Sequence, residues 1–260
     1  MAALRKLSHS EPTQGAKFRS LCTRMIPWLY KDAPFPSLSH ALAEPNGLLA
    51  AGGDLSVQRL LDAYSRGIFP WYQKGDPILW WSPDPRMVLL PHELTISRSL
   101  AKTVKRKRFE VRIDTAFREV IDACAGSRFA TGKRGRHTTW ITPEMQKAYI
   151  DLHCAGFAHS IESYFEGELA GGLYGVALGR VFFGESMFYR VSDASKVALA
   201  HLARQLARWN FAMIDCQMET SHLASFGARS IARREFTRAL KELVNYPPPT
   251  AWLLDHDLFE

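Results

Sequence analysis

The sequence predicts an α+β fold in which a small N-terminal domain precedes a larger domain built around an antiparallel sheet. Three closely spaced apolar runs, separated by turn residues, indicate a meander of strands. A long amphipathic stretch and a further apolar run follow them and add a helix and a strand to the same sheet. A segment rich in proline and tryptophan, around residues 68–90, separates the two parts.

The N-terminal part begins with an extension. Basic residues in the first twenty positions are interrupted by Ser8, Ser10 and Glu11 before any apolar stretch of signal-peptide length can form. We therefore expect residues 1–35 to be a flexible extension.

Residues 36–85 are assigned to the small domain. Ser56 can cap a helix over residues 57–66, which Gly67 ends. Four prolines interrupt the chain beyond this helix and predict loops. These loops should hold three tryptophans, Trp71, Trp80 and Trp81.

Residues 86–260 are expected to form the larger domain. The predicted strands span residues 87–90, 109–113, 158–165, 169–177, 181–188 and 211–216. The predicted helices span residues 115–124, 143–155, 193–209 and 232–244. Turns at Glu166-Gly167 and Gly179-Arg180 make the middle three strands antiparallel. The crossover through the long helix should place the last strand parallel to its neighbour.

Composition excludes several classes of protein. With 260 residues and 47% hydrophobic content, the chain can bury a core, and disorder is not expected. Its apolar runs fall short of the roughly 18 residues that cross a bilayer, so we expect no membrane span. The cysteines, Cys22, Cys124, Cys154 and Cys216, are far apart and contain no C-x-x-C pair, which fits a reducing cytoplasm and no bound metal.

Positive charge is concentrated in two segments. The net charge of +7 suggests a polyanionic partner or only a soluble surface. The first cluster consists of Lys102, Lys105, Arg106, Lys107 and Arg108. The second consists of Lys133, Arg134, Arg136 and His137. Contact with phosphates and simple solvation explain both clusters equally well.

Polar side chains interrupt two of the predicted strands. Glu185 lies in the run VFFGESMF, and Asp215 and Gln217 lie in FAMIDCQ. Asp215 and Gln217 are two residues apart, so their side chains should share a face of the sheet. A buried carboxylate is costly unless it is paired, which makes these residues candidates for chemistry. A structural polar pair or a capping carboxylate would explain them as well.

Gly184 is a candidate for a β-bulge. Simple alternation places Glu185 with Phe183 and Met187 on one face and Phe182 on the other. A bulge at Gly184 would break this count.

Two tryptophans have alternative interpretations, and two histidines have a single one. Trp71 and Trp140 can be ordinary core residues, or they can stack on an unpaired base. His159 and His222 lack the spacing of metal ligands, and we expect both to be structural. The sequence contains no G-x-S-x-G elbow, P-loop or H-E-x-x-H motif.

Seven motifs together resemble the leucyl/phenylalanyl-tRNA-protein transferases, from about Pro36 to Phe259. They are NGLLAAGGD from Asn46, GIFPW from Gly67, WWSPDPR from Trp80, WIT from Trp140, GESMF from Gly184, ASK from Ala194 and IDCQ from Ile214. The first thirty or so residues have no counterpart in the family, Thr220 stands where the family has asparagine, and Leu173 stands in place of methionine.

The resemblance implies an enzyme that moves leucine or phenylalanine, and methionine less well, from aminoacyl-tRNA to the α-amine of a protein beginning with Arg or Lys. The product carries a degradation signal of the N-end rule. The resemblance also implies a C-terminal domain similar to the GCN5-related acetyltransferase fold, a cytoplasmic location and no cofactor. We expect a monomer, because no coiled-coil heptads are present.

Site residues carried over from the family fall into two groups. The resemblance makes Asp215 and Gln217 the catalytic pair and places Glu185 next to the reacting centre. The residues expected to bind the aminoacyl group or the terminal adenosine are Leu173, Phe182, Met187, Ile214, Trp71, Trp140 and Tyr64. Asp215 should fix the Gln217 amide and, with Glu185, make the acceptor site negative.

Two other functions remain open at this point. An acyl-CoA acetyltransferase would use a similar sheet, but the segment Arg190–Lys196 has no glycine to cradle a pyrophosphate. A non-catalytic RNA-binding module would explain the charge and the tryptophans but gives no reason for Asp215 and Gln217.

Overall fold

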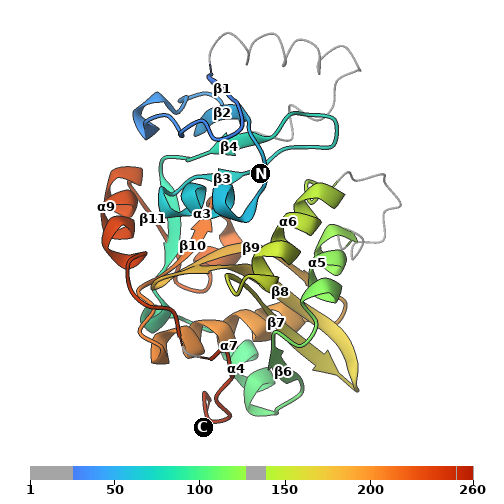
Figure 1. Ribbon diagram of the computed structural model, residues 1–260. Helices are drawn as coiled ribbons and strands as arrows, with labels where there is room; N and C mark the ends of the chain where they lie inside the picture. The colour runs from blue at the N-terminus through green and yellow to red at the C-terminus, as the bar shows by residue number, and fades with distance from the viewer. Residues whose placement is uncertain (1–25, 127–138, 250, 260) are drawn as a thin grey trace.

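The computed structural model describes residues 26–126, 139–249 and 251–259. The described elements form two sheets (Figure 1). The four-stranded sheet lies in the N-terminal part, and the seven-stranded sheet carries most of the helices. The change from one sheet to the other falls between Trp81 and Arg86, after the Pro-rich segment.

The small sheet has the strand order β1-β2-β4-β3. Its strands are β1 (Trp28–Leu29), β2 (Leu48–Gly52), β3 (Phe69–Pro70) and β4 (Leu79–Trp81). Strand β1 pairs with β2 in parallel, and Phe35 packs edge-on against Trp80 at 4.9 Å between ring centroids. Residues 26–35 are therefore part of this layer, and the expectation that they belong to a flexible extension is wrong.

The tryptophans of the Pro-rich segment differ in their surroundings. Trp80 and Trp81 lie in β4 and are buried, so the prediction that they occupy loops is wrong. The prolines did not prevent short strands, because Pro70 ends β3, where its missing N–H costs little. Trp71 follows β3 and is partly exposed.

Helix α3 (Val57–Ser65) confirms the sequence prediction. The Ser56 side chain accepts a hydrogen bond from the Arg59 backbone N–H at 3.4 Å, as an N-cap residue does. Gly67 follows the helix with φ +77°, a left-handed conformation that glycine adopts without strain.

The large sheet has the strand order β11-β5-β10-β9-β8-β7-β6. Its strands are β5 (Arg86–Leu89), β6 (Glu110–Ile113), β7 (Ala158–Phe165), β8 (Glu168–Leu178), β9 (Val181–Tyr189), β10 (Met213–Gln217) and β11 (Arg229–Ile231). The antiparallel meander β7-β8-β9 and the parallel pairing of β10 with β9 are confirmed. Strand β11 was not predicted, because its three residues carry no periodic pattern.

Helices cover both faces of the large sheet (Figure 1). The helices after α3 are α4 (Arg98–Lys105), α5 (Phe117–Gly126), α6 (Pro143–Cys154), α7 (Ala194–Arg208), α8 (Ser221–Ala224) and α9 (Arg233–Leu243). Two 3-10 turns are η1 (Leu38–His40), between β1 and β2, and η2 (Pro91–Glu93), after β5. Helices α4 and α8 are additions to the sequence prediction. Among the residues that the structure describes, no helix has the length and hydropathy needed to cross a membrane.

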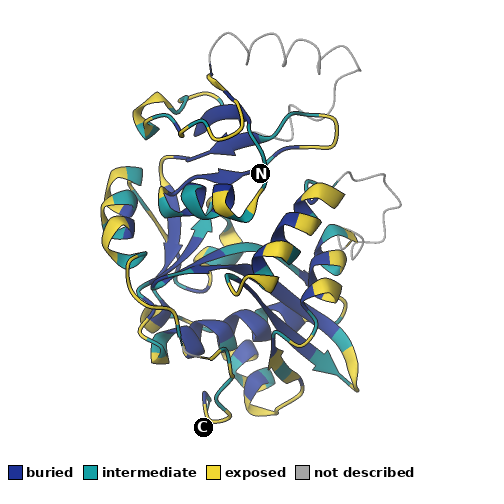
Figure 2. Cartoon of the chain, in the orientation of Figure 1, coloured by how far each residue is buried: buried dark blue, intermediate teal, exposed yellow. Residues whose placement is uncertain are grey.

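Two hydrophobic cores lie on opposite faces of the large sheet. The first core contains residues of α3, α5, α6 and the small sheet, and the second contains residues of α4 and α7. Figure 2 shows the strands buried between them and the exposed outer faces of the helices. The small sheet and the large sheet therefore share one continuous core.

Strands β9 and β10 separate partway along their length. Their pairing ends at Asp215 and Phe183, although β9 continues to Tyr189. Beyond this point, residues 184–187 of β9 are partly exposed, even though β9 lies in the interior of the sheet. The separation therefore opens the middle of the sheet to the surface.

Gly67→Ala should destabilise the fold more than Gly75→Ala. Both glycines have positive φ, so each substitution costs about 1 kcal/mol through the backbone. A Cβ at Gly67 would lie 2.8 Å from the Phe236 ring, whereas no atom lies within 4 Å of one at Gly75. Denaturant unfolding of the two variants checks this difference, and equal losses of stability would show that the Phe236 contact is not restrictive.

Candidate active site

A bulge places Glu185 where β9 separates from β10. Tyr174 pairs with Ser186 and Gly175 pairs with Gly184, so Glu185 is the extra residue of β9. The bulge predicted at Gly184 is thus confirmed. Glu185 shares the face of Phe183, whereas Met187 returns to the face of Phe182, so simple alternation failed at this point.

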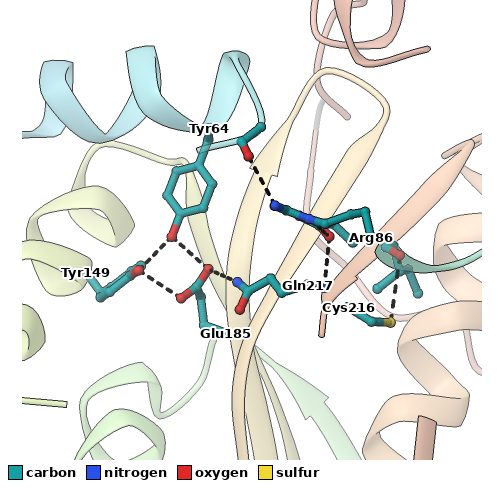
Figure 3. A network of polar contacts seen from close by, with 9 residues as sticks. Tyr64, Arg86, Tyr149, Glu185, Cys216 and Gln217 are labelled. Carbon is teal, nitrogen blue, oxygen red and sulfur yellow. Dashed lines mark hydrogen bonds and ion pairs between the residues drawn. The ribbon is translucent and has the colours of Figure 1, made fainter. Parts of the chain in front are cut away.

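The Glu185 carboxylate lies among three polar side chains from three elements (Figure 3). Tyr64 of α3 donates to Oε1 at 2.7 Å, and Tyr149 of α6 donates to Oε2 at 2.8 Å. The Gln217 amide of β10 donates from Nε2 to Oε1 at 3.0 Å. The two hydroxyl oxygens, of Tyr64 and Tyr149, are themselves 2.6 Å apart.

The oxygens of Glu185, Tyr64 and Tyr149 form a ring that needs one more proton than the phenols supply. The three contacts of the ring each require a hydrogen, and the two hydroxyls have one each. A protonated Glu185 supplies the third by donating from Oε2 to Tyr149, which can then donate to Tyr64. The ring is therefore complete when Glu185 is protonated and lacks one hydrogen when Glu185 is ionised.

The surroundings raise the pKa values of all three side chains of the ring. The pKa of Glu185 is raised to about 7, because burial, the largest cause, and the neighbouring Asp215 charge together outweigh the tyrosine hydrogen bonds, which lower it. Burial and the Glu185 charge also raise the pKa values of Tyr64 and Tyr149 well above their ordinary range. Glu185 can thus gain or lose a proton near neutrality, while both phenols stay neutral.

Asp215 forms a buried ion pair with Arg86 of β5. Arg86 donates from Nε to Oδ1 at 2.8 Å and from a terminal nitrogen to Oδ2 at 2.6 Å, and both side chains are 0% exposed. Asp215 does not contact the Gln217 side-chain amide directly, because that amide binds Glu185. The expectation that Asp215 adds negative charge to the acceptor site fails, since Arg86 neutralises it.

Gln217 is held by its backbone as well as its side chain. Its N–H donates to Asp215 Oδ1 at 2.9 Å, and its φ of +60° is left-handed. A second bulge, at Cys216, makes this possible. The side chains of Asp215 and Gln217 still share one face, as predicted, and that face is the one toward the first core. With its amide nitrogen on Glu185, the Gln217 side-chain oxygen meets no donor among the described residues and is available to a ligand.

The four apolar residues expected to bind the aminoacyl side chain lie together on the other face. They are Leu173, Phe182, Met187 and Ile214, and all belong to the second core. Met187 is partly exposed beside the separation of β9 and β10, and the other three are buried. Met187 follows Glu185 by two residues along β9, so the group lies beside Glu185 but on the opposite face of the sheet.

Both candidate tryptophans are partly exposed residues against the first core. Trp71 packs edge-on against Trp81 with 5.5 Å between ring centroids, and its carbonyl accepts from Trp81 Nε1 at 2.6 Å. Trp140 lies just before α6, which carries Tyr149. Each retains accessible surface, so stacking on a base is compatible with the structure.

The first basic cluster lies apart from this network. Lys102, Lys105, Arg106, Lys107 and Arg108 are all exposed, on and after α4, which packs on the second core. The cluster of Lys133, Arg134, Arg136 and His137 lies outside the described residues.

His159 has a structural partner. Its Nδ1 lies 2.6 Å from Asp114, and its ring stacks on Trp252 at 3.5 Å. In the described part of the chain, no three His, Cys, Asp or Glu side chains come together as metal ligands would.

Arg86 and Tyr149 were not recognised as site residues from the sequence. Tyr149 lies within the helix predicted at residues 143–155, and Arg86 lies at the predicted start of the larger domain. A signal was present for Arg86, since an arginine that opens an apolar strand needs a buried anion. No pattern in the sequence marks Tyr149.

Comparisons with known proteins match most of the chain. Residues 88–241 match the family described as leucyl/phenylalanyl-tRNA protein transferase, and residues 53–84 match its N-terminal domain. Relatives named leucyl/phenylalanyl-tRNA--protein transferase include one from Nitrosospira multiformis, 61% identical over 91% of this chain and 100% of its own length. Another, from Azoarcus sp., is 60% identical over 88% of this chain and 95% of its own.

A solved structure of L-PGS from Bacillus licheniformis covers 77% of this chain and 74% of its own, at a TM-score of 0.40 and 8% identity. The family match and the sequence relatives agree with the motifs quoted above. The chain belongs to the leucyl/phenylalanyl-tRNA protein transferase family.

Proposed function

We propose that this chain transfers leucine or phenylalanine, and methionine less well, from aminoacyl-tRNA to the α-amino group of proteins that begin with Arg or Lys. The reaction forms a peptide bond and creates a degradation signal of the N-end rule. The observation that carries the proposal is the Glu185 carboxyl, with a pKa raised to about 7, joined to Gln217 at the opening between β9 and β10.

The donor ester is already activated, so positioning should contribute most of the rate. Holding an amine against an ester carbonyl can contribute roughly 7 to 11 kcal/mol. The free oxygen of the Gln217 side chain can accept an N–H of the attacking amine and fix its direction. Gln217 does not titrate near neutrality, so a different group must take the proton.

Glu185 is the group best suited to move that proton. As the C–N bond forms, the amine nitrogen becomes positive, and ionised Glu185 accepts its proton, which completes the hydrogen-bonded ring with Tyr64 and Tyr149. The ester C–O bond then breaks, and the proton passes from Glu185 to the departing ribose oxygen. The carboxyl group returns to its starting form, and no cofactor is consumed.

The opening between the strands supports a site for the aminoacyl side chain. An apolar side chain entering beside Met187 would reach Leu173, Phe182 and Ile214 in the second core. Apolar walls favour Leu, Phe and Met over charged side chains by a few kcal/mol. Trp71 and Trp140 would stack on the terminal adenosine, with the neutral Tyr64 hydroxyl close by.

An acceptor protein whose first residue is positively charged fits this site, because the Glu185 carboxyl group is negative when ionised. Asp215 adds little, because Arg86 neutralises it. The meander, α7 and the parallel β10 support a similarity to the GCN5-related acetyltransferase fold. We further infer a monomer that acts in the cytoplasm.

The direct test is to incubate the protein with labelled Leu-tRNA and a peptide that begins with Arg. Label should pass to the peptide, and Gln217→Ala should lower the single-turnover rate by about tenfold or more while Leu-tRNA binding persists. Met218→Ala is the control, because Met218 is the exposed neighbour. No transfer by the wild type would overturn the proposal, and acetyl-CoA binding in its place would favour an acetyltransferase.

The transfer rate should rise with pH through about 7 as Glu185 ionises, and again near 7.7 to 8.0 as the amine loses its proton. Glu185→Gln should be slower and should lose the lower inflection only. A lower inflection that survives in this variant would assign the titration to another group.

The pH dependence of folding stability tests the raised pKa of Glu185 independently of the transfer rate. Since folding raises the pKa of Glu185 above its unfolded value of 4.5, the wild type should lose stability as the pH rises from 4.5 to 7. Thermal unfolding of Glu185→Gln should lack this loss.

The α4 cluster should contact tRNA phosphates without reading bases. Changing Lys102, Lys105 and Arg106 to Gln should lower the salt slope of Leu-tRNA binding by about 0.7–0.9 per contact removed. A control with Lys31, Arg234 and Lys241 changed to Gln removes equal charge elsewhere on the exposed surface. An equal effect in both triple variants would mean that only net charge matters.

A further inference from the structure

Arg86 is enclosed on every side by parts of the chain that are far apart in sequence. Besides its two bonds to Asp215, it donates from a terminal nitrogen to the Gly67 carbonyl at 3.1 Å. Its guanidinium lies over the rings of Phe69 and Phe236, 4.8 and 4.7 Å from their centroids. Five contacts thus fix the plane of the guanidinium, and its two-pronged geometry fixes the plane of the carboxylate.

The Asp215 carboxylate passes this orientation on to Gln217. Its Oδ1 accepts from Arg86 Nε and also from the Gln217 N–H, so one oxygen links the guanidinium to the backbone of the bulge. The left-handed φ of Gln217 is unfavourable for a residue other than glycine. The bond to Asp215 compensates for this cost.

Gln217 then reaches the reacting carboxyl group. Its Nε2 donates to Glu185 Oε1, and its side-chain oxygen meets no donor among the described residues. A shift of the Asp215 carboxylate would therefore move the Gln217 backbone and, with it, both ends of the amide.

We propose that Arg86 is a positioning residue for aminoacyl transfer, which acts through Asp215 on the Gln217 amide. Asp215 is by the same argument a positioning residue and not the catalytic base. This inference rests on the proposed transferase function and deepens it, since it assigns the orientation of the amide to a guanidinium that touches no substrate.

Arg86 can also affect the site through its charge, which acts on the pKa of Glu185. The groups that face Glu185 are Tyr64 of α3, Tyr149 of α6, Tyr174 of β8, Asp215 of β10 and Arg86 of β5. The Asp215 charge raises the pKa of Glu185, and the Arg86 charge lowers it. Lysine keeps the charge but lacks the two-pronged geometry, so Arg86→Lys separates orientation from electrostatics.

The test is a double-mutant cycle of Arg86→Lys with Gln217→Ala, measured with Leu-tRNA and an Arg-initiated peptide well below the unfolding temperature of each variant. Arg86→Lys alone should lower kcat by about tenfold or more and change KM for Leu-tRNA by less than about twofold. In the Gln217→Ala background it should change kcat by less than about twofold. The inflection near pH 7 should stay in place in the single variant.

A matched control comes from the other largely buried arginine that binds backbone carbonyls. Arg59 is 8% exposed, donates to the Ala33 carbonyl and lies over the Phe35 ring, outside the Glu185 network. Arg59→Lys should lower stability without changing kcat in either background.

Equal kcat losses from Arg86→Lys with and without Gln217 would overturn the proposal, as would an unchanged kcat in the single variant. If Arg86→Lys does not fold, Asp215→Glu takes its place, because it keeps the charge that pairs with Arg86 but moves the carboxylate relative to the Gln217 N–H, and the cycle has the same interpretation. A wild type that transfers no leucine would refute the proposed function instead, which keeps the two failures distinct.

Discussion

The ion pair between Arg86 and Asp215 joins the parts of the molecule that build the site. It links β5 to β10, and through the Gly67 carbonyl it reaches the end of α3, which carries Tyr64. Both charges are fully buried, so loss of either partner should leave the other uncompensated at a cost of about 3–5 kcal/mol. The small sheet, α9 and the large sheet therefore meet at an interaction that tolerates little change.

Two β-bulges give two largely apolar strands, β9 and β10, their polar side chains at the candidate site. The first presents Glu185 to the first core, and the second gives Gln217 its left-handed conformation. Between them, β9 and β10 part and expose residues that an interior strand would otherwise bury. The polar network lies on one face of the sheet and the apolar group around Met187 on the other, and the two meet along β9 at residues 185–187.

The sequence predicted the meander, the crossover and the parallel last strand, because periodicity and turn residues are local signals. It also singled out Glu185, Asp215 and Gln217, since polar residues in apolar strands stand out. It could not predict the partners of these residues. The contacts of Asp215 with Arg86 and of Glu185 with Tyr64 and Tyr149 join positions 36 to 129 residues apart. Short elements such as β1, β4 and β11 were missed because tertiary pairing, not periodicity, defines them.

The hydrogen-bonded ring of Glu185, Tyr64 and Tyr149 has one proton too few when the carboxyl group is ionised, and this shortage is the chemical basis of the proposed proton transfer. The measurement that tests it most directly is an NMR titration of the Glu185 side-chain carboxyl carbon in the folded protein, assigned with Glu185→Gln. A midpoint near pH 7 is expected. A midpoint near 4.5, the ordinary value, would contradict the existence of the ring and the role of Glu185 in moving the proton.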